Sequence, residues 1–214
     1  MATAIERHHA AVEHHHDEHH HHVIEFTPAQ RLSMNRLGLW LFLISETFLF
    51  AGILVARIVL LRDEGGSFTR PELDQQLGLV ITFILLLSSL AVYMGETAIS
   101  RGEIGRFKAG IGAAIVMGLI FTVGVGYEWS IAHFAPSDGV EGGMFFFMTG
   151  MHALHVLTGI IFLMIVYWNG RLGNYTKQSH WGVEASALYW HFVDVVWVFF
   201  YVALYLIGHV PEVH

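Results

Sequence analysis

Five long runs of apolar residues follow one another along the chain, and short polar segments separate them. The runs cover roughly residues 37–61, 77–100, 109–132, 144–168 and 185–207. Each run is long enough to cross the hydrocarbon core of a bilayer, which takes about 20 apolar residues in helical form. Helices are the expected spanning form because a helix satisfies its own backbone hydrogen bonds in lipid. The pattern predicts an all-α integral membrane protein, with a bundle of five transmembrane helices within residues 32–214.

The composition agrees with a membrane protein and excludes several kinds of site. Hydrophobic residues make up 54% of the chain and charged residues 14%, whereas charged residues make up about 25% of a typical soluble domain. The sequence has no cysteine, which excludes disulfides, thiolate metal sites and c-type haem attachment. The net charge of −7 argues against nucleic acid as a partner.

Basic residues collect on one side of the predicted bundle. Eight of the eleven lysines and arginines lie in the N-terminal tail or in the two loops on the same side as that tail. These eight are Arg7, Arg31, Arg36, Arg101, Arg106, Lys108, Arg171 and Lys177. The other side holds Arg57, Arg62 and Arg70. Because loops rich in Lys and Arg stay in the cytoplasm, we expect a cytoplasmic N-terminus and a C-terminus on the periplasmic or outer side.

The first segment of the chain, residues 1–31, is polar and rich in histidine. Its run HHHDEHHHH is interrupted by two acidic residues, which favours a native segment over a purification tag. Such a run binds divalent metals weakly, and we expect a disordered, solvated cytoplasmic tail rather than a dedicated metal site. The histidines available for weak binding are His14, His15, His16, His19, His20, His21 and His22.

Ionisable residues within the apolar runs are the candidate functional groups. Each costs about 2.5–3.5 kcal/mol at the centre of a membrane helix, so such groups normally face the protein interior. Glu46 lies about ten residues into the first run. It could exchange protons, or it could donate a hydrogen bond between helices as a neutral acid. We favour the second interpretation for an isolated carboxyl group.

Two histidines, His152 and His155, are three residues apart and therefore share one side of a helix. The spacing allows a metal site, but no carboxylate lies in the adjacent turns, and two imidazoles alone seldom form one. We favour hydrogen bonds between helices. In the last run, His191 and Asp194 have the same spacing, and either a neutral Asp or an Asp–His⁺ pair would satisfy both groups. Trp190 and other aromatic residues surround them and are expected to fill packing gaps.

Further polar residues lie close to the ends of the predicted helices. These are Glu96, Glu128 and Glu184, of which Glu96 and Glu128 are interpreted as boundary residues with packing roles. Arg171 and Lys177 lie on the predicted cytoplasmic side, where they are candidates for binding anionic lipid headgroups.

The residues alone favour a subunit over an enzyme. The intramembrane histidines do not form the matched pairs that a transmembrane di-haem protein needs, and no nucleotide-binding loop or nucleophile constellation is present. An alternative is an autonomous transporter or proton channel that uses Glu46 and the intramembrane histidines. It lacks support because no helix pair is interrupted by Gly and Pro, as transporter sites often are. A haem-bearing electron carrier is a third reading.

Three stretches together resemble subunit III of the haem-copper oxidases. The family's first shared helix is similar to LWLFLISETFLFAG, and its penultimate helix is similar to FFFMTGMHALHVLTG. Its last helix is similar to HWGVEASALYWHFVDVVWVFFYVALYL. The resemblance covers roughly residues 32–209 and fits the bacterial five-helix form. The Ser45–Glu46 pair resembles cytochrome c oxidase, whereas related quinol oxidase and nitric oxide reductase subunits tend to have Asp there.

The resemblance implies a subunit that holds no haem or copper of its own. In this family subunit III packs against the catalytic subunit I, which carries these cofactors in aerobic electron transport coupled to proton pumping. Its helices form a V-shaped cleft that holds phospholipid, and it supports proton uptake and the stability of subunit I. The implied partners also include subunit II, small subunits and a respiratory supercomplex. The implied location is the bacterial plasma membrane.

The resemblance also assigns roles to single residues. Glu46 matches the family's buried glutamate, and His155 matches the second histidine of the penultimate-helix pattern, so a hydrogen bond between them is expected. Glu184, His191 and Asp194 map onto the last helix. We interpret His191 and Asp194 as an internal polar clamp that fixes helix packing, rather than as proton carriers.

Overall fold

The computed structural model describes residues 26–62 and 71–208, and these form long helices joined by short connections. The helices are α1 (Pro28–Leu60), α2 (Gln75–Arg101), α3 (Ile104–Ile131), α4 (Gly139–Arg171), α5 (Trp181–Tyr201) and the π-helix η1 (Val202–Leu206). Five spans, the last made of α5 and η1 together, are long and apolar enough to cross a membrane. The predicted all-α bundle of five spanning helices is confirmed.

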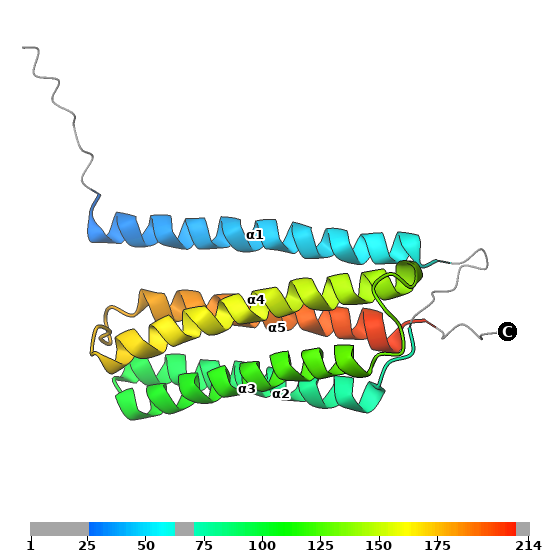
Figure 1. Cartoon of the computed structure of the whole chain (residues 1–214). Helices are drawn as coiled ribbons and strands as arrows, with labels where there is room; N and C mark the ends of the chain where they lie inside the picture. Colours follow the sequence, from blue (N-terminus) through cyan, green and yellow to red (C-terminus); the bar gives the residue numbers. More distant parts are fainter. Residues whose placement is uncertain (1–25, 63–70, 209–214) are drawn as a thin grey trace, which may run out of the picture.

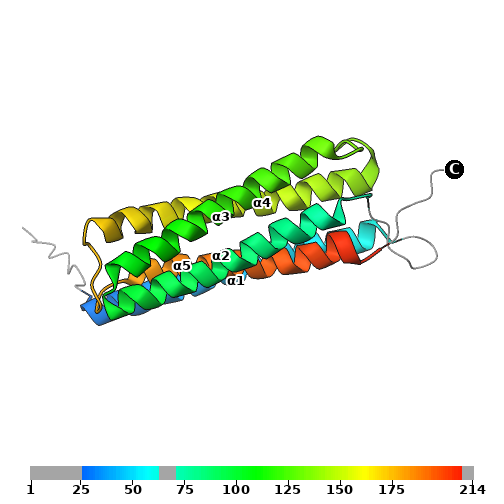
Figure 2. The same ribbon diagram turned by 90° about the horizontal axis from the view of Figure 1, so that it is seen from below.

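Successive helices run in opposite directions, and α5 is central to the bundle. It contacts α1, α2 and α4, while α3 packs between α2 and α4 (Figures 1 and 2). Helix α1 lies along one side and contacts only α4 and α5 closely among the described helices. The chain enters α1 at one end of the bundle and leaves η1 at the opposite end (Figure 1).

The observed helices extend beyond the apolar runs that predicted them, most clearly at the start of α1. The predicted start near residue 37 is nine residues late, because apolarity marks the hydrocarbon and not the helix end. Thr27 caps α1: its hydroxyl accepts from the Gln30 backbone N–H, and the Gln30 side chain accepts from the Thr27 N–H. Pro28 is well suited to the first helical position. Residues 28–31 of the predicted tail are therefore helical, and the histidine run lies outside the described residues.

The C-terminal end of the last span is a π-helix, which the sequence pattern did not predict. The Ile207 N–H bonds to the Val202 carbonyl, five residues back. Carbonyl groups at this end find partners on other helices. Arg57 of α1 donates to the Ala203 carbonyl from Nε at 3.1 Å and from Nη2 at 2.7 Å, and Gln75 of α2 donates to the Tyr205 carbonyl. The buried cation of Arg57 thus lies at the negative end of the helix dipole.

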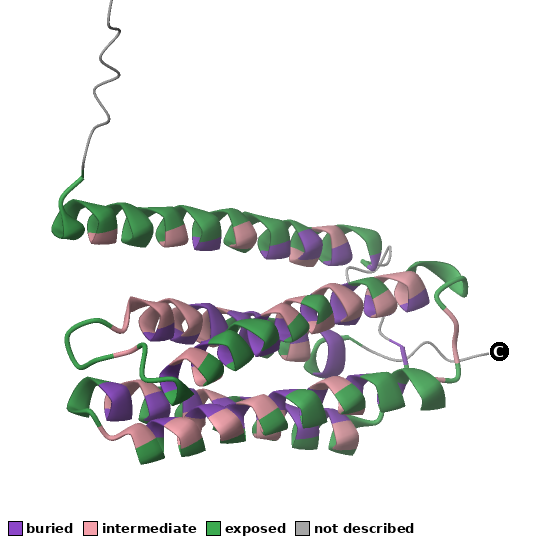
Figure 3. Cartoon of the chain, turned by 60° about the vertical axis from the view of Figure 1, so that its left-hand side comes forward, coloured by how far each residue is buried: buried purple, intermediate pink, exposed green. Residues whose placement is uncertain are grey.

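Large aromatic rings fill the centre of the bundle, and small residues make room for them. The Trp190 ring on α5 packs against Gly118 of α3 and Gly159 of α4, where a Cβ atom would come within 2.6 Å and 2.8 Å of ring carbons. Buried residues line the inner faces, whereas most of α1 is exposed outside its contact with α4 and α5 (Figure 3). Helix α1 is therefore the least enclosed element of the described chain.

Candidate functional site

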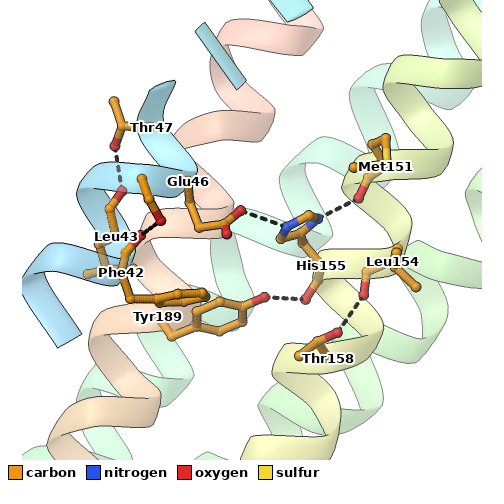
Figure 4. Close-up of polar contacts among 10 residues, drawn as sticks. Phe42, Leu43, Glu46, Thr47, Met151, Leu154, His155, Thr158 and Tyr189 are labelled. Atoms are coloured by element: carbon orange, nitrogen blue, oxygen red, sulfur yellow. Dashed lines mark hydrogen bonds and ion pairs between the residues drawn. The ribbon is translucent and has the colours of Figure 1, made fainter. Parts of the chain in front are cut away.

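The polar contact that joins α1 to α4 lies in the middle of the first span. Glu46 projects from α1 towards His155 of α4, and His155 Nε2 lies 3.0 Å from Glu46 Oε2 (Figure 4). This is the contact that the family resemblance implies. Phe50, one turn further along α1, packs edge-on against the His155 ring at 4.8 Å between centroids. Both polar side chains are mostly shielded by protein.

The surrounding hydrogen bonds fix the charge of the Glu46–His155 contact. His155 Nδ1 lies 2.7 Å from the Met151 carbonyl, which can only accept, so Nδ1 carries a proton. A second proton must then lie between Nε2 and the Glu46 carboxyl for those two atoms to bond. The pair is either a neutral acid with neutral imidazole or a carboxylate with imidazolium. In both cases its net charge is zero, which suits a site within a bilayer.

A groove leads from this contact to the end of the bundle where α1 begins. The Tyr189 hydroxyl donates to the His155 carbonyl at 3.2 Å, and its ring stacks on Phe42 of α1 (Figure 4). Both rings line a largely apolar cavity of about 560 Å³ between α1, α4 and α5. The groove therefore ends, inside the membrane, beside the Glu46–His155 bond.

Polar side chains surround the mouth of the same groove. Arg36 of α1 lies 3.4 Å from the Glu184 carboxylate of α5, and its guanidinium stacks over the Trp181 ring. His180 also approaches Glu184, at 3.4 Å. Tyr175, in the loop before α5, lines the groove, and burial raises the pKa of its hydroxyl, which keeps it neutral. The mouth thus carries the guanidinium of Arg36, the carboxylate of Glu184, and two further hydrogen-bonding groups, His180 and the Tyr175 hydroxyl.

His152 does not join His155 in a common site. Its Nε2 lies 3.1 Å from the Val193 carbonyl of α5, so Nε2 carries the proton. The ring is fully buried and packs against Trp197 and Phe121. Nδ1 of His152 has no hydrogen-bond partner among the described residues. The two histidines bond to different helices, as the interpretation of interhelical hydrogen bonding expects.

His191 and Asp194 do not pair directly. His191 Nδ1 lies 2.5 Å from the Ser89 hydroxyl of α2. Asp194 is 3% exposed, and although Ser89 also lies near it, neither carboxyl oxygen meets hydrogen-bond geometry with any described group. Of the two arrangements that the sequence left open, the direct Asp–His pair is not formed, because the facing helix supplies Ser89 as the partner of His191. Both residues nevertheless face the α2–α5 interface.

Two further hydrogen bonds join α5 to α2. Both donors are tryptophan indoles, whose polar N–H groups the sequence analysis did not consider. The indole of Trp190 donates to the Ser88 hydroxyl at 2.9 Å. Two helical turns further along α5, the indole of Trp197 donates to the Thr82 hydroxyl, also at 2.9 Å. Tryptophan was treated as packing volume alone, yet a buried indole N–H requires an acceptor. That requirement could have indicated from the sequence that Trp190 and Trp197 bond to a neighbouring helix.

Glu128, interpreted from the sequence as a boundary residue with a packing role, is buried inside the bundle. It is 2% exposed, and the Tyr205 hydroxyl from η1 lies 2.6 Å from Oε1 and 2.5 Å from Oε2. Its position near the end of α3 indicated exposure, but η1 continues the last span far enough to cover it. Glu96 is partly buried and lies near Glu184 and His180 at the other end of the bundle.

Arg171 and Lys177 are both exposed at the end of the bundle where α1 begins. Arg171 stacks on Trp168 of its own helix. Lys177 follows α4, and its side chain lies over Gly102 at the turn between α2 and α3.

Comparison with known proteins identifies the family of this chain. The family model of cytochrome c oxidase subunit III matches residues 18–209. The chain belongs to the cytochrome c oxidase subunit III family. The identification extends over all five spanning helices, so it includes every intramembrane contact described above.

Individual members of the subunit III family are similar over most of their length. The chain is 34% identical over 177 residues to cytochrome c oxidase subunit 3 of Synechocystis sp., covering 81% of this chain and 76% of that protein. It is 35% identical over 181 residues to the subunit of Mus musculus, covering 81% and 69%. With the subunit of Pyricularia grisea it shares 37% over 193 residues, covering 86% and 71%. These relatives favour the terminal-oxidase reading over the channel and the other oxidase classes.

Membership of the subunit III family agrees with the chemistry of the site. Within residues 26–62 and 71–208, no group of three or more His, Asp or Glu side chains is placed to hold a metal ion. The polar groups instead join helices to one another: α1 to α4, α4 to α5, and α5 to α2. In this arrangement the polar side chains hold the helices in register.

Proposed function

We propose that this chain is a non-catalytic subunit of a bacterial cytochrome c oxidase that binds the catalytic subunit I. Haem and copper would be held by partner subunits, and the N-terminus would be cytoplasmic and the C-terminus periplasmic. The observation that carries the proposal is the subunit III match over residues 18–209. The cross-helix hydrogen bonds support it, because they occupy the polar side chains in packing. Subunit II, small subunits or a supercomplex would complete the assembly.

A structural phospholipid is part of the same proposal. The groove between α1, α4 and α5 has the apolar walls that an acyl chain requires. Its mouth carries Arg36, which suits a phosphate, and the hydroxyl of Tyr175. This groove is our candidate for the lipid cleft that the family resemblance implies, and Arg171 remains a candidate headgroup contact outside it.

The polar contacts inside this chain would act on subunit I indirectly, by fixing the positions of the helices. These contacts involve Glu46, His155, His191 and Asp194. The Glu46–His155 bond holds the loosely enclosed α1 against α4 and so sets the width of the lipid groove. The contacts between α5 and α2 hold the central helix. We propose that this fixed surface supports proton uptake and stability of subunit I, with no proton passing through these side chains.

Isolation of the complex tests the proposal. The tagged chain is purified from its native membranes in mild detergent, and a reduced-minus-oxidised spectrum is recorded before and after the partners are stripped away. We expect haem bands that accompany the chain and vanish from the stripped chain, with subunits I and II identified in the same fraction. Haem retained by the stripped chain would make the histidines ligands. Haem absent from both fractions would contradict the oxidase assignment.

A further inference from the structure

A second groove lies on the α2–α3 hairpin, away from the α1 groove. It encloses about 520 Å³ and follows the two helices from their connecting turn towards the bilayer centre. The helices approach closely here, since a Cβ atom on Gly110 would lie 2.7 Å from the Ala91 carbonyl and 2.8 Å from the Gly95 nitrogen. Small residues form much of the lining: Ala91, Ala98, Ala109, Gly110 and Ala113. Tyr93 and Met94 add larger apolar walls.

Positive charge collects at the end of this groove. Arg101, the last residue of α2, and Arg106, in the first turn of α3, both line it and are exposed. Lys177 reaches the same turn from the α4–α5 connection, since its side chain lies over Gly102. One carboxylate, Glu103, also lines the groove and pairs with Arg106 at 2.8 Å. Three cations therefore face one anion at the groove's end.

The depth of these charges matches the polar surface of a membrane. The apolar runs of α2 and α3 end and begin close to Arg101 and Arg106, so the guanidinium groups stand at headgroup level when the helices span a bilayer. The small-residue part of the groove extends from there into the hydrocarbon region. An occupant must therefore be anionic at one end and apolar along its length.

We propose that the α2–α3 groove binds one anionic phospholipid of the surrounding bilayer. Its phosphate pairs with Arg101 and Arg106, with Lys177 close by, and one acyl chain lies along the small residues. Charge complementarity selects this occupant, because a basic residue near the membrane surface attracts anionic lipid and arginine matches phosphate geometry. The site shares no lining residue with the proposed α1 groove.

Native mass spectrometry of the delipidated oxidase, titrated with phosphatidylglycerol, tests this site. Each basic residue near the surface contributes about fivefold to binding. We therefore expect about fivefold weaker binding in Arg101→Gln or Arg106→Gln and about 25-fold weaker binding in the double variant. Arg31→Gln, which removes an exposed arginine at the start of α1, is the matched control and should leave binding unchanged. Phosphatidylcholine with the same acyl chains should bind much more weakly.

A groove-filling variant separates a built site from general attraction to charge. Ala113→Phe leaves every cation in place and should abolish the tight phosphatidylglycerol site. Unchanged binding in Ala113→Phe, or equal affinity in the double arginine variant and Arg31→Gln, would overturn the proposal. Haem content of the wild-type preparation is measured in parallel. It reports on the proposed oxidase function, so failure of that function and failure of the lipid site give different results.

Discussion

At the residue scale, the hydrogen-bond partner of a polar side chain inside the membrane determines what that side chain does. Glu46 and His155 are the clearest pair, since one proton lies on Nδ1 and one is shared between the two groups. The backbone carbonyl of Met151 determines this arrangement by accepting from the ring. When the imidazole is neutral, a residue that replaces Glu46 keeps the contact only if it donates a hydrogen bond to Nε2.

Glu46→Gln should preserve the contact and Glu46→Ala should remove it. The glutamine amide can donate to His155 Nε2, whereas alanine leaves a shielded imidazole nitrogen without its partner, at a cost of about 1–3 kcal/mol. The fraction of oxidase that keeps this subunit through a detergent titration measures the difference, together with oxygen consumption. A Glu46→Gln oxidase that keeps the subunit but loses activity would show a proton-carrying role instead.

Tyr205→Phe should destabilise the subunit by about 1–3 kcal/mol, because it leaves the Glu128 carboxyl buried without its donor. Tyr201→Phe is the matched control. The Tyr201 ring stacks on Tyr205 at 4.9 Å, and the structure shows no hydrogen bond from its hydroxyl to a described residue. Thermal dissociation of the purified complex compares the two. Equal shifts for both variants would mean that the Glu128 contact contributes nothing specific.

At the element scale, α5 organises the bundle by placing bulky aromatic rings against small residues on its neighbours. Trp190 fits only because α3 and α4 present glycine at the two points of contact. The same ring donates to Ser88 on α2, so one side chain relates α5 to three other helices. Without a strong hydrophobic force between helices in lipid, such close packing and hydrogen bonding provide the association.

Gly118→Ala should destabilise the bundle despite the higher helix propensity of alanine. The added Cβ would come within 2.6 Å of the Trp190 ring, and such overpacking costs about 1–3 kcal/mol. Gly126→Ala, on the same helix, meets no atom within 4 Å and serves as the control. There we expect no loss, and a gain of up to about 1 kcal/mol from propensity. Resistance to unfolding in detergent measures both, and equal stability would contradict this account of α5 packing.

At the scale of the whole molecule, helices α2 to α5 enclose one another while α1 lies at their side. An apolar groove beside α1 and another on the α2–α3 hairpin both reach the end of the bundle where α1 begins. Most of the basic side chains that the structure describes also lie at that end. At the same end, Thr27 closes the start of α1 through its reciprocal hydrogen bonds with Gln30.

Deletion of residues 1–25 should therefore leave assembly and oxygen consumption unchanged. The Thr27–Gln30 capping box remains intact in the shortened chain. Removal of residues 1–30 is the comparison, since it deletes the cap and should lower stability by about 1 kcal/mol. Co-purification with haem and thermal dissociation of the complex are the measurements. Loss of assembly in the shorter deletion would give the histidine-rich segment a structural role.

The sequence by itself determined the number of spanning helices, their approximate positions and the family. The bilayer allows few structures, and a long apolar run in it has one stable form. The motif around Glu46 and His155 also predicted their contact through the family resemblance. The apolar runs did not give the helix ends, because caps such as Thr27 lie outside them.

Only the tertiary structure decided which polar groups meet. Partner choice depends on how far each helix is rotated and shifted against its neighbours, and packing of all five helices sets those quantities together. Thus His191 meets Ser89 rather than Asp194, and Glu128 is covered by Tyr205. Arg57 lies within the first apolar run, and only the structure shows that it is buried and donates to the Ala203 carbonyl of η1.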